Sequence, residues 1–94
     1  MSAATAPGND PDKLAEQLEV AMLALLAHRG VGKTICPSEA ARRVQPDDWR
    51  PLMDLTRTVA CQLIDQGRLV ATQRGIAVDL VNVHGPIRLR LPVP

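Results

Sequence analysis

The chain is 94 residues long, 46% hydrophobic and 22% charged, which is typical of one small globular domain. It contains one tryptophan and neither phenylalanine nor tyrosine. Most proteins that bind single-stranded RNA or DNA stack bases on several aromatic rings, so this composition excludes that class. The net charge of +1 gives no strong overall attraction to nucleic acids or membrane surfaces.

Residues 1–11 are mostly small or polar and include two prolines, so we expect a disordered tail before a domain over residues 12–94. The tail lacks the basic start and apolar run of a secretory signal. The longest apolar run, Val20–Ala27, has eight residues and is too short to cross a bilayer. We therefore expect a cytoplasmic protein with reduced cysteines and no membrane partner.

Two helices are expected in the first half of the chain. The first follows a capping aspartate, Asp10 or Asp12, and ends near Gly30. The second covers about residues 37–44. It opens with Cys36–Glu39, in which proline takes the first helical position and glutamate the capping-box position. The apolar positions of both helices predict a buried stripe made of Leu14, Leu18, Ala21, Met22, Leu25, Leu26, Ala40, Ala41 and Val44.

A third, longer helix is expected at about residues 49–66. Asp48 is the predicted N-cap, and Gly67 has the place of a C-cap glycine. Pro51 falls in the first turn, where proline is tolerated. The spacing of its apolar residues predicts a buried face made of Leu52, Leu55, Val59 and Leu63.

The last third of the chain has the pattern of strands. Residues 68–73 are predicted to form one strand, and residues 76–83 a loop or a short extra strand. Residues 87–91 alternate strictly between apolar residues and arginine, as a half-buried strand does. Three helices followed by a β-hairpin predict a mainly helical α+β domain, the winged helix-turn-helix.

Four segments together resemble the bacterial domain-of-unknown-function family 3253: Gly32–Glu39, Asp48–Met53, Gly67–Gly75 and Gly85–Arg90. The resemblance extends over about residues 14–91. It implies a small bacterial winged-helix-like protein with no assigned activity, and no catalytic or binding residue can be carried over from the family.

Three local patterns suggest chemistry that their context does not support. Ala27–Thr34 fits a loosened phosphate-binding loop, but it follows a helix rather than a strand and no helix begins at its lysine. Cys36 precedes a helix, yet no histidine is adjacent in sequence, so we expect a small packed or capping thiol. The cysteines and histidines also lack the close spacing of a zinc site. We therefore expect no enzymatic activity, metal or cofactor.

Two functions remain open from the sequence, and the first is binding of double-stranded DNA. Residues 47–66 hold four aspartates and two arginines, so the expected recognition helix is acidic, whereas residues 67–94 are basic. Trp49, at the start of that helix, is expected to pack against the core, with a binding anchor as the alternative. The predicted base-side contacts are Arg50, Thr56, Arg57 and Gln62, and the predicted phosphate contacts are Lys33, Ser38, Gln73 and Arg74.

The second function is protein–protein interaction on the same fold, either with another protein or as a homodimer. Val20 and Leu23 lie opposite the buried stripe of the first helix by spacing. Together with residues 76–83 they are the predicted contact surface. A fold does not determine its function, so the sequence alone favours neither.

Overall fold

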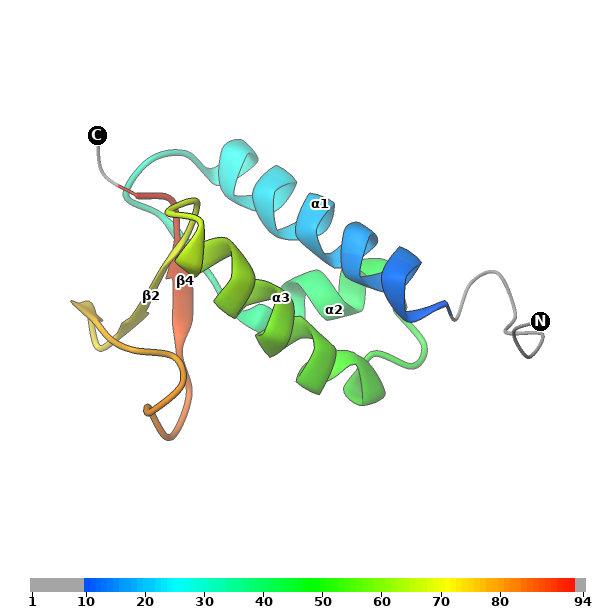
Figure 1. Ribbon diagram of the computed structural model, residues 1–94. Helices are drawn as coiled ribbons and strands as arrows, with labels where there is room; N and C mark the ends of the chain where they lie inside the picture. Colours follow the sequence, from blue (N-terminus) through cyan, green and yellow to red (C-terminus); the bar gives the residue numbers. More distant parts are fainter. Residues whose placement is uncertain (1–9, 93–94) are drawn as a thin grey trace.

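The computed structural model describes residues 10–92. Within them, three α-helices pack beside a four-stranded antiparallel sheet, and three of its strands follow the last helix (Figure 1). The helices are α1 (Pro11–Arg29), α2 (Pro37–Val44) and α3 (Met53–Asp65). The strands are β1 (Thr34–Ile35), between α1 and α2, and β2 (Val70–Gln73), β3 (Ile76–Ala77) and β4 (Arg88–Arg90), after α3. This is the predicted α+β, winged-helix-like arrangement. Most of the predicted tail, residues 1–9, lies outside the described part.

Local capping groups fix three of the helix ends as predicted. Asp10 caps α1, because its carboxylate accepts a hydrogen bond from the Asp12 amide at 3.0 Å. Gly30 ends α1 with φ of 100° and donates its amide to the Leu26 carbonyl. Gly67 follows α3 with φ of 74°, and its amide donates to the Ile64 carbonyl at 2.9 Å. These glycines supply the left-handed backbone that such helix ends require.

The start of the third helix differs from the prediction. Asp48 does not cap it, because Asp48 lies in a turn where its amide donates to the Gln45 carbonyl at 3.2 Å. A 3-10 turn, η2 (Arg50–Leu52), comes next, and α3 begins only at Met53, without a side-chain cap. Pro51 has a fixed φ and no amide donor, so it fits the first residues of this tighter turn.

The sheet has the strand order β1-β4-β2-β3. Ile35 of β1 pairs with Leu89 of β4, and Leu89 pairs in turn with Ala71 of β2. All three side chains are buried and are part of the core. Because neighbouring residues of a strand point to opposite faces, Arg88 and Arg90 lie on the outer face.

A tight hairpin joins β2 to β3. Gln73 pairs with Ile76, so only Arg74 and Gly75 form the turn. Both have positive φ, 53° and 80°, as a two-residue type I′ turn requires. The short extra strand allowed by the sequence is therefore present. Residues 70–90, which include β2, β3, β4 and their loops, are called the wing.

The core confirms most of the predicted stripes. Leu25 and Val44 are only half-buried, and on α3 the buried residue is Thr56 rather than the predicted Leu55. The α3 face that meets the core is centred on Val59 and Leu63, which places Thr56 inward. The predicted positions that are buried are Leu14, Leu18, Ala21, Met22, Leu26, Ala40, Ala41, Leu52, Val59 and Leu63.

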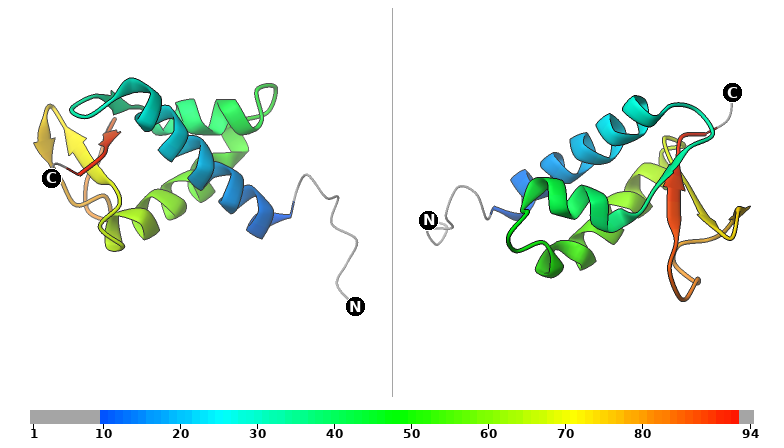
Figure 2. Two further views of the ribbon diagram at one scale, coloured as in Figure 1. Left: turned by 90° about the horizontal axis from the view of Figure 1, so that it is seen from above. Right: turned by 180° about the vertical axis from the view of Figure 1, so that it is seen from behind.

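The sheet stands at one end of the helices, and α1 begins at the other end (Figures 1 and 2). The loop between β3 and β4 projects on the side of α3, away from α1 (Figure 1). This arrangement brings α3 and the wing to one side of the domain. None of the helices within residues 10–92 has the length and apolar character needed to span a membrane.

Candidate nucleic-acid interface

Two arginines share one tryptophan ring at the entrance to α3. The guanidinium carbon of Arg42, from the last turn of α2, lies 4.5 Å from the centroid of the Trp49 ring. That of Arg50 lies 4.7 Å from the same centroid. Trp49 itself is half-buried and packs against the core, as predicted. We call Arg42, Trp49 and Arg50 the Trp49 cluster.

Both arginines of the Trp49 cluster are exposed. Among residues 10–92 the ion pairs are Arg29–Glu39 and Arg68–Glu19, so neither cluster arginine has a carboxylate at ion-pair distance. A cation–π contact at an exposed site contributes about 0.5–1 kcal/mol, which favours the observed position of each side chain without fixing it. The ring therefore gathers two positive charges, neither neutralised by a carboxylate of the described chain, at the turn between α2 and α3.

The exposed face of α3 is acidic. Asp54, Thr58, Gln62 and Asp65 are exposed along it, and the Thr58 hydroxyl donates to the Asp54 carbonyl at 3.1 Å. Arg57 is half-buried, and its guanidinium donates to the Leu80 carbonyl of the wing at 3.5 Å. Carboxylates on this face repel phosphates, although they can accept hydrogen bonds from cytosine. Positive charge is therefore concentrated at the turn before α3 rather than along the helix.

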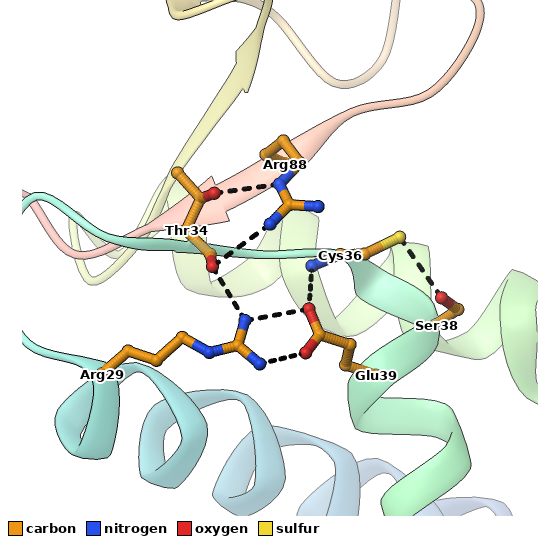
Figure 3. A network of polar contacts seen from close by, with 6 residues as sticks. All are labelled: Arg29, Thr34, Cys36, Ser38, Glu39 and Arg88. Atoms are coloured by element: carbon orange, nitrogen blue, oxygen red, sulfur yellow. Dashed lines mark hydrogen bonds and ion pairs between the residues drawn. The ribbon is translucent and has the colours of Figure 1, made fainter.

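A polar network fixes the junction of α1, α2 and the sheet (Figure 3). The guanidinium of Arg29 forms an ion pair with Glu39 and donates to the Thr34 carbonyl at 2.9 Å. Glu39 also accepts the Cys36 amide at 2.7 Å, the predicted capping-box bond. The Arg88 Nε donates to the Thr34 hydroxyl at 2.9 Å. Arg29 and Arg88 are thus engaged in holding the fold.

The same network changes the pKa of two of its members, Glu39 and Arg29. The hydrogen bond and ion pair with Arg29 hold the pKa of Glu39 below its ordinary value, against the opposing effect of partial burial. The hydrogen bond to Glu39 raises the pKa of the Arg29 guanidinium. Glu39 consequently stabilises the fold in its ionised form.

A family model described as "Protein of unknown function (DUF3253)" matches residues 15–92, nearly all of the described chain. The chain belongs to this family. A search of curated proteins gave no match. The resemblance noted in the sequence is thus confirmed. The family description assigns no function, so the geometry of this DUF3253 protein is the basis for its candidate site.

One predicted contact of the DUF3253 protein, that of Thr56 with a DNA base, is wrong. Thr56 is fully buried, and its hydroxyl donates to the Leu52 carbonyl at 2.7 Å, so it cannot reach a ligand outside the domain. Ser38 is half-buried, and its hydroxyl donates to the Cys36 sulfur at 3.2 Å. Ser38 lies at the start of α2, and its contact with phosphate stays a prediction. Its hydroxyl would have to give up the hydrogen bond to Cys36 to make that contact.

The other predicted residues lie in separate parts of the surface. Arg50 belongs to the Trp49 cluster, Gln62 is exposed on α3, and Lys33 is exposed in the turn before β1. Gln73 and Arg74 line one hollow of about 520 Å³ beside β4. The Gln73 amide donates to the carbonyls of His84, at 2.7 Å, and Pro86. Gln73 therefore holds the wing loop in place, whereas Lys33 and Arg74 are exposed cations.

Sequence reasoning missed the partnership of Arg42 with Trp49. The sequence shows Arg42 only as one of two arginines at the end of a short helix. The contact depends on how α2 packs against the turn that precedes α3, seven residues later. A lone tryptophan a few residues after Arg42 and Arg43 and next to Arg50 was the only available signal.

Proposed function

We propose that this DUF3253 protein is a DNA-binding domain without catalytic activity, which holds the phosphate backbone of a duplex at the start of α3 and at the wing. The Trp49 cluster carries the proposal. The start of the third helix is the part of a helix-turn-helix that approaches the groove. Arg42 and Arg50 lie at that place, exposed and without a carboxylate partner in the described chain.

Guanidinium groups suit phosphate oxygens because their planar donors form two parallel hydrogen bonds. Contact of Arg42 and Arg50 with the Trp49 ring removes part of the conformational freedom that each side chain would otherwise lose on binding. Lys33, Arg43 and Arg74 are further exposed cations that could extend the contact. Five phosphate contacts would make the affinity fall by about 500-fold between 50 and 200 mM salt, at a slope of about −0.9 per contact.

The acidic α3 face favours binding to the phosphate backbone over the reading of base edges. Asp54 is exposed in the first turn of α3, where a recognition helix would read base edges, and Asp65 is exposed at the other end of the helix. They oppose close approach of the phosphates along the groove. We therefore assign the binding energy to the cations at the start of α3 and on the wing. We expect the affinity to depend only weakly on base sequence, since phosphate contacts carry no sequence information.

Fluorescence anisotropy of a labelled random duplex tests this function directly. The duplex is titrated with the protein at low salt and again at physiological salt. We expect binding at low salt that weakens steeply with added salt, and the slope counts the phosphate contacts. Absence of binding at low salt would reject the proposal.

A protein partner is the second candidate, supported by exposed apolar side chains on the wing. Ile76 and Val81 are 70% and 79% exposed, and the Val81 position lies on the loop that projects beside α3. Large exposed apolar residues that cluster on one surface are typical of protein contacts. Substitution of Val81 by serine would leave duplex binding unchanged if DNA is the ligand, because valine makes no phosphate contact.

A further inference from the structure

The hairpin turn of the wing holds an arginine in a backbone conformation that arginine rarely adopts. Arg74 has φ of 53°, and within residues 10–92 it is the only residue other than glycine with a positive φ. The type I′ turn that it forms with Gly75 favours asparagine, aspartate or glycine at this position, because these residues tolerate the left-handed region. Residues held in such conformations cluster at ligand-binding sites. The exposed guanidinium of Arg74 is the group that a preferred turn residue would lack.

Arg74 lines a hollow that the fold of the wing builds. The hollow has a volume of about 520 Å³ and is also lined by Gln73, His84, Gly85 and Pro86. The Gln73 amide joins its two walls, because it donates to the His84 carbonyl at 2.7 Å and to the Pro86 carbonyl at 3.2 Å. Glycine at position 85 leaves room for that amide, since a Cβ there would lie 3.3 Å from the Gln73 Nε2. The walls of the hollow are therefore held together before any ligand binds.

The hollow gathers groups that can be positive and no carboxylate. Of the described residues that line it, only Arg74 and His84 have side chains that can carry a charge, and both are exposed. Asp79 is the only acidic residue in the sequence of the wing. Its carboxylate accepts hydrogen bonds within its own loop, from the Val81 amide at 3.0 Å and the Asn82 side chain at 2.9 Å. This acid is therefore engaged away from the lining of the hollow.

The other cations beside the hollow are also engaged elsewhere. Arg57 of α3 donates to the Leu80 carbonyl at 3.5 Å. Arg88 of β4 donates to the Thr34 hydroxyl at 2.9 Å. A histidine side chain changes its charge between about pH 5 and pH 8. The hollow therefore presents one positive charge at the alkaline end of this range and two at the acidic end.

We propose that this hollow seats one phosphate group of a duplex backbone, between the Arg74 guanidinium and the His84 ring, and that protonation of His84 strengthens the contact. Guanidinium and imidazolium N–H groups donate charge-assisted hydrogen bonds to phosphate oxygens. Two cations with no acid among the lining residues select an anion as the ligand. The duplex as the source of the phosphate rests on the proposed function. The loop that carries His84 projects on the side of α3, away from α1 (Figure 1), which is the side assigned to the duplex.

The pH dependence of duplex binding tests the proposal, with the second histidine of the chain as the matched control. Anisotropy titrations of the random duplex are made at about pH 5.5 and pH 8 with the wild type, His84→Gln and His28→Gln. One additional phosphate contact should make the fall in wild-type affinity between 50 and 200 mM salt about 3.5-fold larger at the lower pH. His28 is exposed in the last turn of α1, so His28→Gln should behave like the wild type.

His84→Gln should lose this pH dependence, because every other group that titrates in the range is common to all three proteins. If His84→Gln and the wild type respond equally to pH, the proposal is overturned and the proposed function stands. If no protein binds the duplex at low salt, the proposed function is rejected, and the duplex is rejected as the source of the phosphate. The two failures are therefore distinguishable.

Inorganic phosphate tests the hollow without DNA. Proton NMR follows the ring signals of the two histidines, and His84→Gln identifies which belongs to His84. Phosphate, compared with sodium chloride at equal ionic strength, should raise the pH at which the His84 ring titrates and leave His28 unchanged. Arg74→Asn should abolish this effect while keeping the turn, because asparagine is a preferred residue there. Absence of the effect, an equal effect on His28, or an effect that survives Arg74→Asn would overturn the phosphate seat.

Discussion

Replacement of Glu39 tests whether the network of Figure 3 stabilises the fold through charge or only through capping. Glu39 accepts the Cys36 amide at 2.7 Å and forms the ion pair with Arg29. Glu39→Gln keeps an oxygen acceptor for the Cys36 amide but removes the negative charge. Glu39→Ala removes both interactions, so the two variants separate the capping bond from the ion pair.

The expected effects derive from the two kinds of contact. A helix-capping interaction contributes about 1 kcal/mol to the free energy of unfolding. A partly exposed ion pair contributes about 0.2–1 kcal/mol, and the side chain of Glu39 is 29% exposed. We therefore expect Glu39→Ala to lower the free energy of unfolding by about 1–2 kcal/mol at pH 7, and Glu39→Gln by less than about 1 kcal/mol. For a domain of this size 1 kcal/mol corresponds to a shift in Tm of about 4–8 °C.

The pH dependence gives the sharper measurement. The pKa of Glu39 is lower in the folded state than the ordinary value of 4.5, so the unfolded chain binds the proton more tightly. The stabilisation by the carboxylate is complete above pH 4.5 and is lost as the pH falls through the lower folded-state pKa. Wild type and Glu39→Gln should therefore differ in stability at pH 7, and the difference should shrink as the pH is lowered below 4.5 and through the folded-state pKa. Urea unfolding followed by tryptophan fluorescence measures the difference at each pH, and a difference that stays constant throughout would refute this explanation.

Three further substitutions test the assignment of the surface. Arg50→Gln should reduce the fall in duplex affinity between 50 and 200 mM salt by about 3.5-fold, the share of one phosphate contact. Arg68→Gln has the same change in charge and should leave the dependence of affinity on salt unchanged. If Arg50→Gln and Arg68→Gln show the same dependence on salt, Arg50 is not in the interface. Thr56→Val should lower the free energy of unfolding by about 1 kcal/mol through loss of one hydrogen bond without altering duplex affinity; weaker binding by a normally folded variant would contradict its internal role. Asp65→Asn should strengthen duplex binding, and an unchanged affinity would place the end of α3 away from phosphate.

The fold could be predicted to the extent that local chemistry determines it. Asp10, Gly30 and Gly67 end helices through groups that lie within a few residues of each end, so the sequence is sufficient to find them. The predicted cap at Asp48 and the predicted ligand contact of Thr56 both fail at the start of α3. The 3-10 turn before α3 delays the helix, and the orientation of its faces is decided by packing against the core rather than by the first apolar residue.

The sheet and the candidate site depend on contacts between distant segments. Strand β1 has two residues and is a strand only because β4, more than fifty residues later, pairs with it. The Gln73 amide looked available in the sequence, yet it is used by the wing loop. Arg57 is similarly directed to the Leu80 carbonyl. Residue type identified possible phosphate ligands, but only the packing distinguishes the free cations from the engaged ones.

The proposed phosphate contact limits how much sequence specificity a single domain can have. A single domain that binds through Arg42 and Arg50 gains affinity from phosphate, and phosphate is the same in every duplex. The acidic face of α3 adds few favourable contacts to base edges. Discrimination between duplexes would then depend on how readily each duplex adopts the shape that contact at both the start of α3 and the wing requires, rather than on the reading of bases by α3.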